Sequence, residues 1–253
     1  MSGQFEGKVA LVTGAGGGIG RATAIAFARE GAKVVVADLP GPGGDQTVAM
    51  IKEAGGEARF IATDVSDEQA VAALVEGTVA AYGRLDIAFN NAGVNFDADI
   101  WDNVDAFEKS IAINLTGVAS CIRHEVRQML KQGGGGAIVN TASINGIVGS
   151  PQPGYVGSKH GVVGLTRSAA LAFAKDGIRV NVVSPGPVEF EGGNWDMIKG
   201  TMEKFYQSQL RQHPAGRLGT PEEIARCVVF LASDDAGFIT GSTISANGGQ
   251  YLA

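Results

Sequence analysis

Short apolar runs rich in β-branched residues alternate along this chain with stretches of helical periodicity. In the first cycle, the run "KVALVTG" at 8–14 is followed by "GRATAIAFAREG" at 20–31, whose apolar positions repeat with a helical period and which ends at glycine. We expect a strand and then a helix there. The remaining predicted strands, with helical stretches between them, are 32–38, 58–64, 85–91, 136–143, 178–184 and 242–247.

The apolar runs are continuous rather than alternating, so both faces of the predicted sheet must be covered. Strands that alternate with helices of this length are typical of a parallel, doubly wound sheet with right-handed crossovers. We therefore expect an α/β fold in which a single domain, residues 1–253, holds a seven-stranded parallel sheet with helices on both faces.

Two segments interrupt this rhythm. "GPGGDQ" at 41–46 is predicted to be a turn-rich loop. "SPGPVEFEGGNWDMIKG" at 184–200 is a long Gly/Pro-rich excursion beyond the carboxyl end of a strand, where open α/β sheets bind ligands. We expect residues 186–215, approximately, to form a lid over a substrate.

Charge and composition narrow the partners. A net charge of −6 gives no broad positive field for a nucleic acid. The longest uncharged run, 133–158, holds prolines, glycines and amides and is not expected to span a membrane. The opening "MSGQFEGK" lacks the features of an export signal, which favours the cytoplasm. Cys121, Cys227 and the scattered histidines lack ligand spacing, so no metal site is predicted, and a small molecule is the expected partner.

Two glycine clusters differ in context. "TGAGGGIG" at 13–20 follows a predicted strand and opens a helix, so its backbone N–H groups can face a phosphate. Gly14, Gly18 and Gly20 are the expected close-approach positions. The cluster lacks the lysine of a P-loop. "GGGG" at 133–136 lies between a predicted helix and a strand and is interpreted as a helix stop and loop.

Asp38 ends the second predicted strand, eighteen residues after Gly20, where a carboxylate would accept hydrogen bonds from an adenosine ribose. A 2′-phosphate there would meet negative charge, so NAD is favoured over NADP. Gly17, where an arginine could have supported that phosphate, points the same way. The competing interpretation of Asp38 is a solvated acid at a strand end.

Tyr155 and Lys159 are four positions apart and share one face of a predicted helix. A nearby ammonium stabilises phenolate and is expected to lower the pKa of Tyr155 towards the working range of a general acid or base. By itself such a pair is usually a surface feature. Ser143 ends a predicted strand and could direct its hydroxyl at the same substrate oxygen, whereas Thr141 is expected to face away from the site.

Six motifs occur in an order that resembles the short-chain dehydrogenase/reductase family, over nearly the whole chain. They are "TGAGGGIG", "NNAG" at 90–93, the Asn114 of "INLTG", the Ser143 of "NTASING", "YVGSK" at 155–159 and "SPG" at 184–186. The resemblance implies a Rossmann-fold nicotinamide oxidoreductase with a catalytic tetrad of Asn114, Ser143, Tyr155 and Lys159. It also implies that Asn114 anchors a water-mediated proton relay to Lys159, which binds the nicotinamide ribose.

The same resemblance implies a set of cofactor-binding residues. They are Gly14, Gly18, Ile19, Gly20, Asp38, Asp64, Val65, Asn91, Ala92, Gly93, Tyr155, Lys159, Pro185, Gly186 and Val188, with Asn90 also closing the cofactor side. Near Asp64, helix capping by Ser66 or Asp67 is a competing interpretation. The chain departs from the family at Phe190, where a threonine often holds the nicotinamide carboxamide, so we expect backbone at Val188 or another lid residue to serve.

The lid is rich in aromatic and Met side chains, which either pack internally or line a pocket. We expect an apolar, cyclic or aromatic alcohol or ketone, with contacts from Asn95, Asn145, Gln152, Phe190 and Trp195. The segment "GRLGTPEEIARCVVFLAS" and the tail resemble the family's oligomer-forming end, which implies a homotetramer or homodimer. Three hypotheses remain at this point: an NAD-dependent secondary-alcohol dehydrogenase, an NADPH-dependent 3-ketoacyl-type ketoreductase, and a catalytically silent nucleotide-binding regulator.

Overall fold

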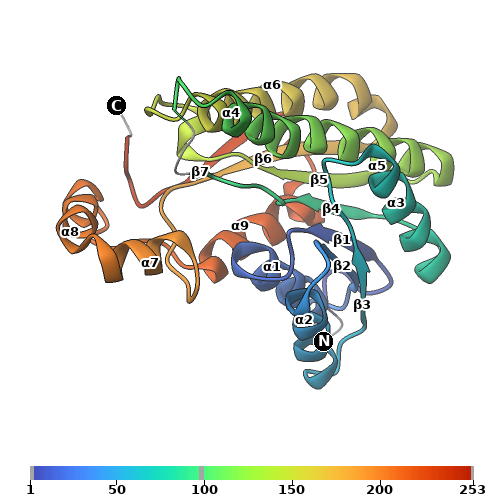
Figure 1. Ribbon diagram of the computed structural model, residues 1–253. Helices are drawn as coiled ribbons and strands as arrows, with labels where there is room; N and C mark the ends of the chain where they lie inside the picture. The colour runs from blue at the N-terminus through green and yellow to red at the C-terminus, as the bar shows by residue number, and fades with distance from the viewer. Residues whose placement is uncertain (1–2, 97–99, 252–253) are drawn as a thin grey trace.

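The computed structural model describes residues 3–96 and 100–251, which form seven parallel strands in the order β3-β2-β1-β4-β5-β6-β7 (Figure 1). The order reverses between β1 and β4, as in doubly wound Rossmann folds. The fold class predicted from the sequence is therefore confirmed. The strands are β1 Val9–Thr13, β2 Lys33–Asp38, β3 Ala58–Ala62, β4 Ile87–Asn90, β5 Gly136–Thr141, β6 Ile178–Pro185 and β7 Thr243–Ala246.

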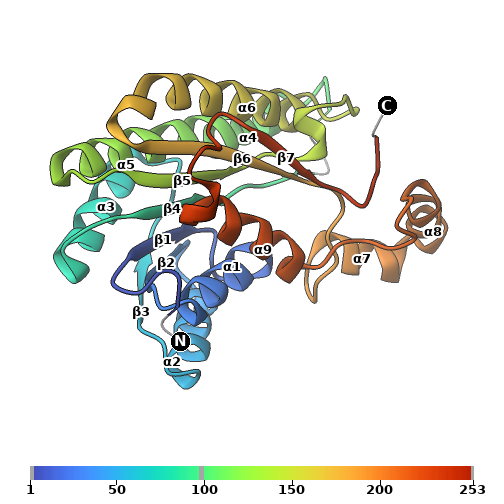
Figure 2. The ribbon, with the colours of Figure 1, turned by 180° about the vertical axis from the view of Figure 1, so that it is seen from behind.

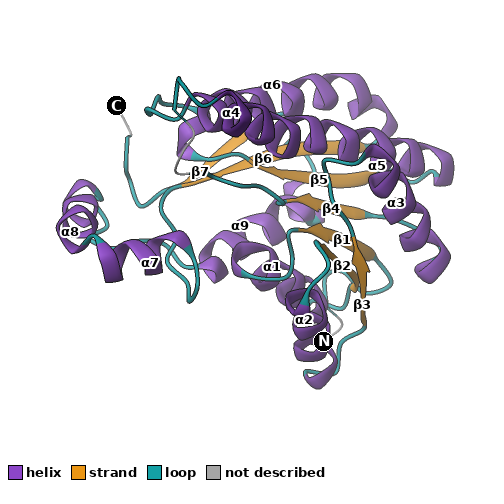
Figure 3. Ribbon diagram, viewed as in Figure 1, coloured by secondary structure: helices purple, strands orange, loops and turns teal. Residues whose placement is uncertain are grey.

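Helices cover both faces of the sheet, as Figures 1 and 3 show. One face carries α1 (Gly18–Arg29), α2 (Pro42–Glu53) and α9 (Pro221–Ala232), and side chains such as Phe27 and Leu231 form its core. On the other face lie α3 (Glu68–Tyr82), α4 (Val104–Ile111), α5 (Val118–Gln132) and α6 (Pro153–Phe173). Strand residues are buried on both faces, which explains the continuous apolar runs in the sequence.

The predicted loop at 41–46 was wrong, because α2 begins at Pro42 with Gly41 as its N-cap. Proline is favoured at the first position of a helix, where its missing N–H costs nothing. The glycines there serve close packing instead of a turn, since a Cβ on Gly44 would collide with the ring of Phe60. The predicted helix at 20–31 is confirmed with shifted ends, because α1 starts two residues earlier.

Residues 186–215 contain two short helices, α7 (Asn194–Thr201) and α8 (Glu203–Gln212), which project from the body beyond the carboxyl end of β6 (Figures 1 and 2). They pack on each other through a stack of Trp195 on Phe205, with ring centroids 6.2 Å apart. Their role as a lid stays a prediction. We call this segment, 194–212, the two-helix arm.

None of the helices in the described part of the chain has the length and apolar character that crossing a membrane requires.

Candidate active site

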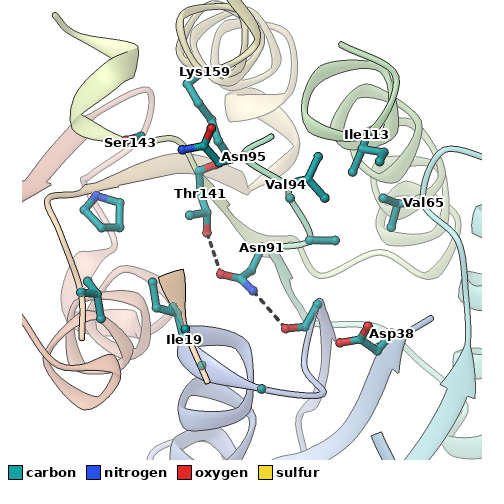
Figure 4. A pocket seen from close by; sticks show the side chains of 18 of the residues that line it. Ile19, Asp38, Val65, Asn91, Val94, Asn95, Ile113, Thr141, Ser143 and Lys159 are labelled. Atoms are coloured by element: carbon teal, nitrogen blue, oxygen red, sulfur yellow. Dashed lines mark hydrogen bonds between the residues drawn. The ribbon is translucent and has the colours of Figure 1, made fainter. Parts of the chain in front are cut away.

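A cleft of about 730 Å³ runs along the carboxyl ends of the parallel strands (Figure 4). Its lining comes from the turn after β1, the ends of β2, β4, β5 and β6, the start of α6 and the arm. The cleft lies where the strand order reverses, which is the place where doubly wound sheets bind nucleotides.

The turn between β1 and α1 is held by backbone packing that only glycine allows. Gly14 has a φ of +63°, and a Cβ there would lie 2.8 Å from the Cα of Ala92. A Cβ on Gly20 would collide with the carbonyl oxygen of Gly14. Helix α1 starts at Gly18 without a side-chain cap, so its first N–H groups face the cleft and favour an anionic ligand.

The Asp38 carboxylate lies at the end of β2 and braces this turn. One oxygen accepts a hydrogen bond from the Gly16 N–H at 2.6 Å, and the other accepts one from the Leu39 N–H at 2.7 Å. Arg21 is engaged nearby, because its guanidinium donates to the Gly16 carbonyl and to Thr47 Oγ1. Asp38 lines the cleft and so places a negative charge on its wall.

Asp64 and Asp67 have different places in the structure: Asp64 lies at the cleft and Asp67 at the start of α3. Asp64 lines the cleft and accepts hydrogen bonds from the Ser66 N–H at 2.9 Å and the Ser66 hydroxyl at 2.7 Å. Asp67 caps α3 by accepting from the Gln69 N–H. The capping interpretation therefore applies to Asp67, and the adenine contact of Asp64 stays a prediction.

Tyr155 lies in the first turn of α6, beside Ser143. Burial raises the pKa of its phenol, and a hydrogen bond with the Ser143 side chain acts in the opposite direction. The Lys159 Nζ lies 5.7 Å from the Tyr155 ring centroid and donates to the Thr141 carbonyl at 3.0 Å. The expected lowering of the Tyr155 pKa by Lys159 is thus wrong for this structure, because burial outweighs it and the ammonium points to a carbonyl.

Burial also lowers the pKa of Lys159 to about 8, because its ammonium is desolvated. At pH 7 most of the lysine is still protonated. Lys159 can therefore carry a positive charge beside Tyr155 at pH 7 and lose its proton at slightly alkaline pH.

Asn114 lies in a π-helical turn, Ala112–Gly117, that separates α4 from α5. Single turns of this kind are frequent at functional sites. The side chain is fully buried; its oxygen accepts from the Val94 N–H at 2.8 Å, and its nitrogen donates to the Val94 carbonyl at 2.8 Å and to Ser158 Oγ at 3.3 Å. Asn114 thus fixes the chain after β4 against the helix that carries Tyr155 and Lys159.

Ser143 follows β5 by two residues and begins a short 3₁₀ helix, Ile144–Gly146, whose Asn145 N–H donates to its hydroxyl at 3.2 Å. Thr141 lines the same cleft, so the expectation that it faces away was wrong. Residues two apart on a strand share a face. The Thr141 hydroxyl donates to Asn91 Oδ1 at 3.4 Å, as Figure 4 shows.

Comparisons with known proteins agree on one family. Residues 14–250 match a family described as enoyl-(acyl carrier protein) reductase. A short chain dehydrogenase/reductase, astE of Aspergillus oryzae, is 42% identical over 98% of this chain and 96% of its own length. Cyclohexanol dehydrogenase of an Acinetobacter species is 41% identical with the same coverage. The crystal structure of levodione reductase superposes with a TM-score of 0.92 at 38% identity, covering 97% of this chain and 98% of the other.

The chain belongs to the short-chain dehydrogenase/reductase family. Family members are oxidoreductases that use NAD or NADP, so this dehydrogenase/reductase is a nicotinamide-nucleotide enzyme. The residues of the cleft suit such a nucleotide. Glycines without room for a Cβ, an uncapped helix start and an Asp38 carboxylate lie at one end of the cleft, and Ser143, Tyr155 and Lys159 lie at the other. This set suits an extended dinucleotide.

Most site residues predicted for this dehydrogenase/reductase line the cleft. The lining includes Gly14, Gly18, Ile19, Asp38, Asp64, Val65, Asn91, Ala92, Gly93, Asn95, Ser143, Tyr155, Lys159, Pro185, Gly186, Val188, Phe190 and Trp195. Gly20 and Asn114 lie behind it, in packing roles. Asn90 is buried and bonds to Glu125 and Asn140, so the expectation that it closes the cofactor side was wrong.

Two of the predicted substrate contacts, Asn145 and Gln152, are outside the lining of the cleft. Asn145 donates to Ser150 Oγ at 3.4 Å, and Gln152 donates to Asn95 Oδ1 at 2.7 Å. Gln152 therefore reaches the site through Asn95. Their part in substrate binding stays a prediction.

The cleft also contains residues that sequence reasoning did not assign. They are Gly17, Ala37, Leu39, Thr63, Val94, Phe96, Ile113, Thr141, Ala142, Gly192 and Gly193. Leu39, Thr63 and Ala142 directly follow a strand, and Ala37 and Thr141 are among the last two residues of one. A search of the predicted strand ends would have found these five. Ile113 had no such signal, because it reaches the cleft from the π-helical turn.

Phe190 is where this member departs from the family pattern, and its ring packs on the glycine turn. A Cβ on Gly18 would lie 2.7 Å from the Phe190 Cζ, and one on Gly193 would lie 2.8 Å from the same atom. The ring therefore fills the space between the start of α1 and the start of the arm. These contacts are made by the far end of the ring, which the shorter threonine side chain would not reach.

Proposed function

We propose that this protein interconverts a secondary alcohol and a ketone on an apolar, cyclic substrate, with NAD(H) as the cofactor. The observation that carries the proposal is the placement of Ser143, Tyr155 and Lys159 at the end of a dinucleotide-sized cleft whose other end holds Asp38. Relatives named for cyclohexanol and levodione support a cyclic alcohol or ketone.

The bound nicotinamide dinucleotide would supply the hydride acceptor in oxidation and the hydride donor in reduction. Gly14, Gly18 and Ile19 would hold its pyrophosphate at the start of α1, and Asp38 its adenosine ribose. Lys159 would bind the nicotinamide ribose. Backbone around Val188 would face the carboxamide, since Phe190 offers no hydroxyl.

In alcohol oxidation, Tyr155 accepts the proton of the substrate hydroxyl while the hydrogen on the adjacent carbon leaves as hydride. The Ser143 hydroxyl holds the substrate oxygen and donates to it as negative charge develops. The Lys159 ammonium, 5.7 Å from the Tyr155 ring centroid, would offset part of the burial that disfavours the phenolate and raises the pKa of the phenol. Asn114 would anchor the relay, because it fixes the backbone of Val94, and its neighbour Gly93 lies close to both Asn114 and Lys159. Ketone reduction runs the same proton transfer in reverse.

The substrate end of the cleft favours an uncharged molecule. We assign Val94, Phe96 and Trp195 to this end, with Ser143 and Tyr155, because all of them line the cleft. Among the described lining residues, the charged ones are Asp38, Asp64 and Lys159, and the two acids are at the other end. A ring with a neutral secondary alcohol or ketone suits such walls.

NAD is proposed over NADP because both Asp38 oxygens are fixed by backbone N–H groups, which holds the charge in place. A 2′-phosphate would be repelled there. The neighbouring Arg21 is bound to Gly16 and Thr47. A 3-ketoacyl-type ketoreductase that uses NADPH is the second candidate, and a silent nucleotide-binding regulator is the third.

A screen of cyclic secondary alcohols and ketones with both cofactor pairs tests the proposal through the absorbance of reduced nicotinamide. We expect turnover of cyclohexanol-like or cyclic dione substrates with NAD(H). Preference for NADP(H) with acyl thioesters would favour the ketoreductase. Binding of NADH without turnover of any alcohol or ketone would favour the regulator.

The homotetramer or homodimer, and the cytoplasmic location, also remain predictions. Exposed apolar side chains on α6, α9 and the segment after it, Leu171, Phe230 and Phe238, are consistent with a covered surface. Light scattering after size exclusion would give the oligomeric state, and cell fractionation the location.

A further inference from the structure

Three consecutive residues after β6 contact three different parts of the molecule. Val188 pairs with Gly219 in an isolated parallel bridge and lines the cleft. Phe190 packs on Gly18 of the phosphate-binding turn. Between them, the Glu189 side chain points to the two-helix arm, where it contacts Lys199 and Tyr206. This short segment therefore joins the cofactor end of the cleft to the arm.

The Glu189 carboxylate binds both helices of the arm. One oxygen lies 2.6 Å from the Lys199 ammonium on α7, and the other accepts a hydrogen bond from the Tyr206 hydroxyl on α8 at 2.5 Å. The Lys199 ammonium is also 5.5 Å from the Tyr206 ring centroid. The hydrogen bonds with Lys199 and then Tyr206 lower the pKa of the Glu189 carboxyl, so it is ionised throughout the neutral range.

The rest of the arm contacts the body sparsely. The two helices pack chiefly on each other. Of the salt bridges between residues that the structure describes, only the one from Glu189 reaches either helix. Tyr206 is the buried residue of α8, and its hydroxyl ends on this carboxylate. Glu189 thus joins both helices of the arm to the segment after β6.

We propose that Glu189 is a positioning residue, whose carboxylate clamps α7 and α8 to the segment after β6 and so holds Trp195 at the substrate end of the cleft. The inference rests on the proposed function, because it assigns the arm to substrate binding. Glu189 does not touch the reacting atoms. It acts through Trp195 and through its neighbour Phe190.

A positioning role makes a specific kinetic prediction. Ser143 lies in the turn after β5, and Tyr155 and Lys159 lie on α6, so loosening the arm leaves the proton-transfer groups in place. We expect Glu189→Gln to raise the substrate KM about threefold to tenfold, in line with the strength of partly exposed ion pairs, with kcat nearly unchanged. Lys199→Met removes the ion pair between Glu189 and α7, and Tyr206→Phe removes the hydrogen bond between Glu189 and α8. Each should raise the substrate KM by less than Glu189→Gln does.

Glu191→Gln is the matched control, since it makes the same charge change at an exposed carboxylate two positions along the chain. The double variant Glu189→Gln/Tyr206→Phe should raise KM by less than the product of the single effects, because both changes break the same contact.

The position of the arm can be measured without turnover. The protein has two tryptophans, and Trp101 is 84% exposed, so Trp101→Phe leaves Trp195 as the sole donor for energy transfer to bound NADH. In that background we expect Glu189→Gln to reduce sensitised nicotinamide emission at saturating NADH, while Glu191→Gln leaves it unchanged. Equal emission in the Glu189→Gln variant and its parent would overturn the clamp.

The two proposals fail separately. If the wild type turns over no alcohol or ketone, the proposed function fails, and the emission measurement still decides on the clamp. If the wild type turns over cyclic alcohols but Glu189→Gln changes neither KM nor emission, or lowers kcat at constant KM, then the clamp is wrong and the function stands.

Discussion

The glycine turn between β1 and α1 and the two-helix arm line the same cleft but are held in opposite ways. The turn is fixed by backbone contacts, with Gly14 against Ala92, Gly20 against Gly14, and Asp38 on Gly16. The arm rests on the Trp195–Phe205 stack and the Glu189 carboxylate, while Met197 and Met202 stay exposed. Backbone packing of this kind leaves little freedom, so the fold itself fixes the glycine turn. The arm is positioned by side-chain contacts.

Among the variants that compare the body with the two-helix arm, we expect Ser143→Ala to change kcat the most. If the chemistry lies wholly on the body side, removing one donor to the substrate oxygen should lower kcat by about 10²- to 10³-fold with cofactor affinity unchanged. Thr141→Val, which removes another cleft hydroxyl but keeps the carbonyl that binds Lys159, should cost far less. Steady-state kinetics with a cyclic alcohol measure both. Equal losses would show that the Ser143 hydroxyl has no special role.

The pH dependence of the free energy of unfolding tests whether a change of pH affects the body independently of the two-helix arm. Burial raises the pKa of Glu125, on α5, from 4.5 to about 7. The folded state thus holds this proton more tightly than the unfolded chain, so the free energy of unfolding should fall as pH rises through this window, by roughly 3 kcal/mol at most. That part of the stability is present below the unfolded pKa and is lost above the folded one.

Urea unfolding of the wild type and Glu125→Gln across this range checks the prediction. The variant should lack the Glu125 part of the slope, and proteolysis of the arm should follow pH equally in both proteins. A slope that survives in Glu125→Gln would assign the effect to other groups.

A pair of glycine substitutions compares the two regions directly. Gly20→Ala forces a Cβ onto the Gly14 carbonyl and should destabilise the protein by about 1–3 kcal/mol and weaken NADH binding. Gly200→Ala lies within α7 with open space around its Cβ, so it should stabilise that helix by up to about 1 kcal/mol. Thermal unfolding and NADH titration distinguish them. Similar effects at both sites would remove the contrast between a tight turn and a loose arm.

The smallest expected effect concerns cofactor choice. A side chain at Gly17 meets nothing within 4 Å, so Gly17→Arg combined with Asp38→Asn should place a cation where Asp38 now repels a 2′-phosphate. We expect the ratio of NADPH to NADH affinity to rise at least about tenfold in fluorescence titrations. Gly17→Gln with Asp38→Asn controls for size. The same ratio in both double variants would argue against an electrostatic basis for the preference.

Much of the fold followed from pattern, and the exceptions have physical causes. All seven strands were predicted to within two residues at each end, because strands buried on both faces give continuous apolar runs. The segment at 41–46 was missed because glycines that serve close packing, as Gly44 does against Phe60, have the composition of a turn. The π-helical turn around Asn114 leaves no trace in helical periodicity.

The site residues likewise divide into those that local sequence patterns predict and those that depend on distant segments. Gly14, Gly18 and Asp38, which line the cleft, were predicted from spacing because the glycine turn after β1 is a local structure. The direction of the Tyr155 pKa could not be found this way, because burial by distant segments decides it. The contacts of Glu189 with Lys199 and Tyr206 likewise depend on how the arm folds back. Neither the Tyr155 pKa nor the contacts of Glu189 can be predicted from a local sequence motif.

The most direct test of the proposed chemistry is a comparison of wild type and Tyr155→Phe in one assay of NADH binding and cyclic-alcohol turnover. Tyr82→Phe, which removes a tyrosine hydroxyl outside the described lining of the cleft, is the control. Proton transfer by Tyr155 predicts that Tyr155→Phe binds NADH with near wild-type affinity and loses at least about a hundredfold in turnover, with Tyr82→Phe unaffected. Turnover by Tyr155→Phe at the wild-type rate would contradict the account.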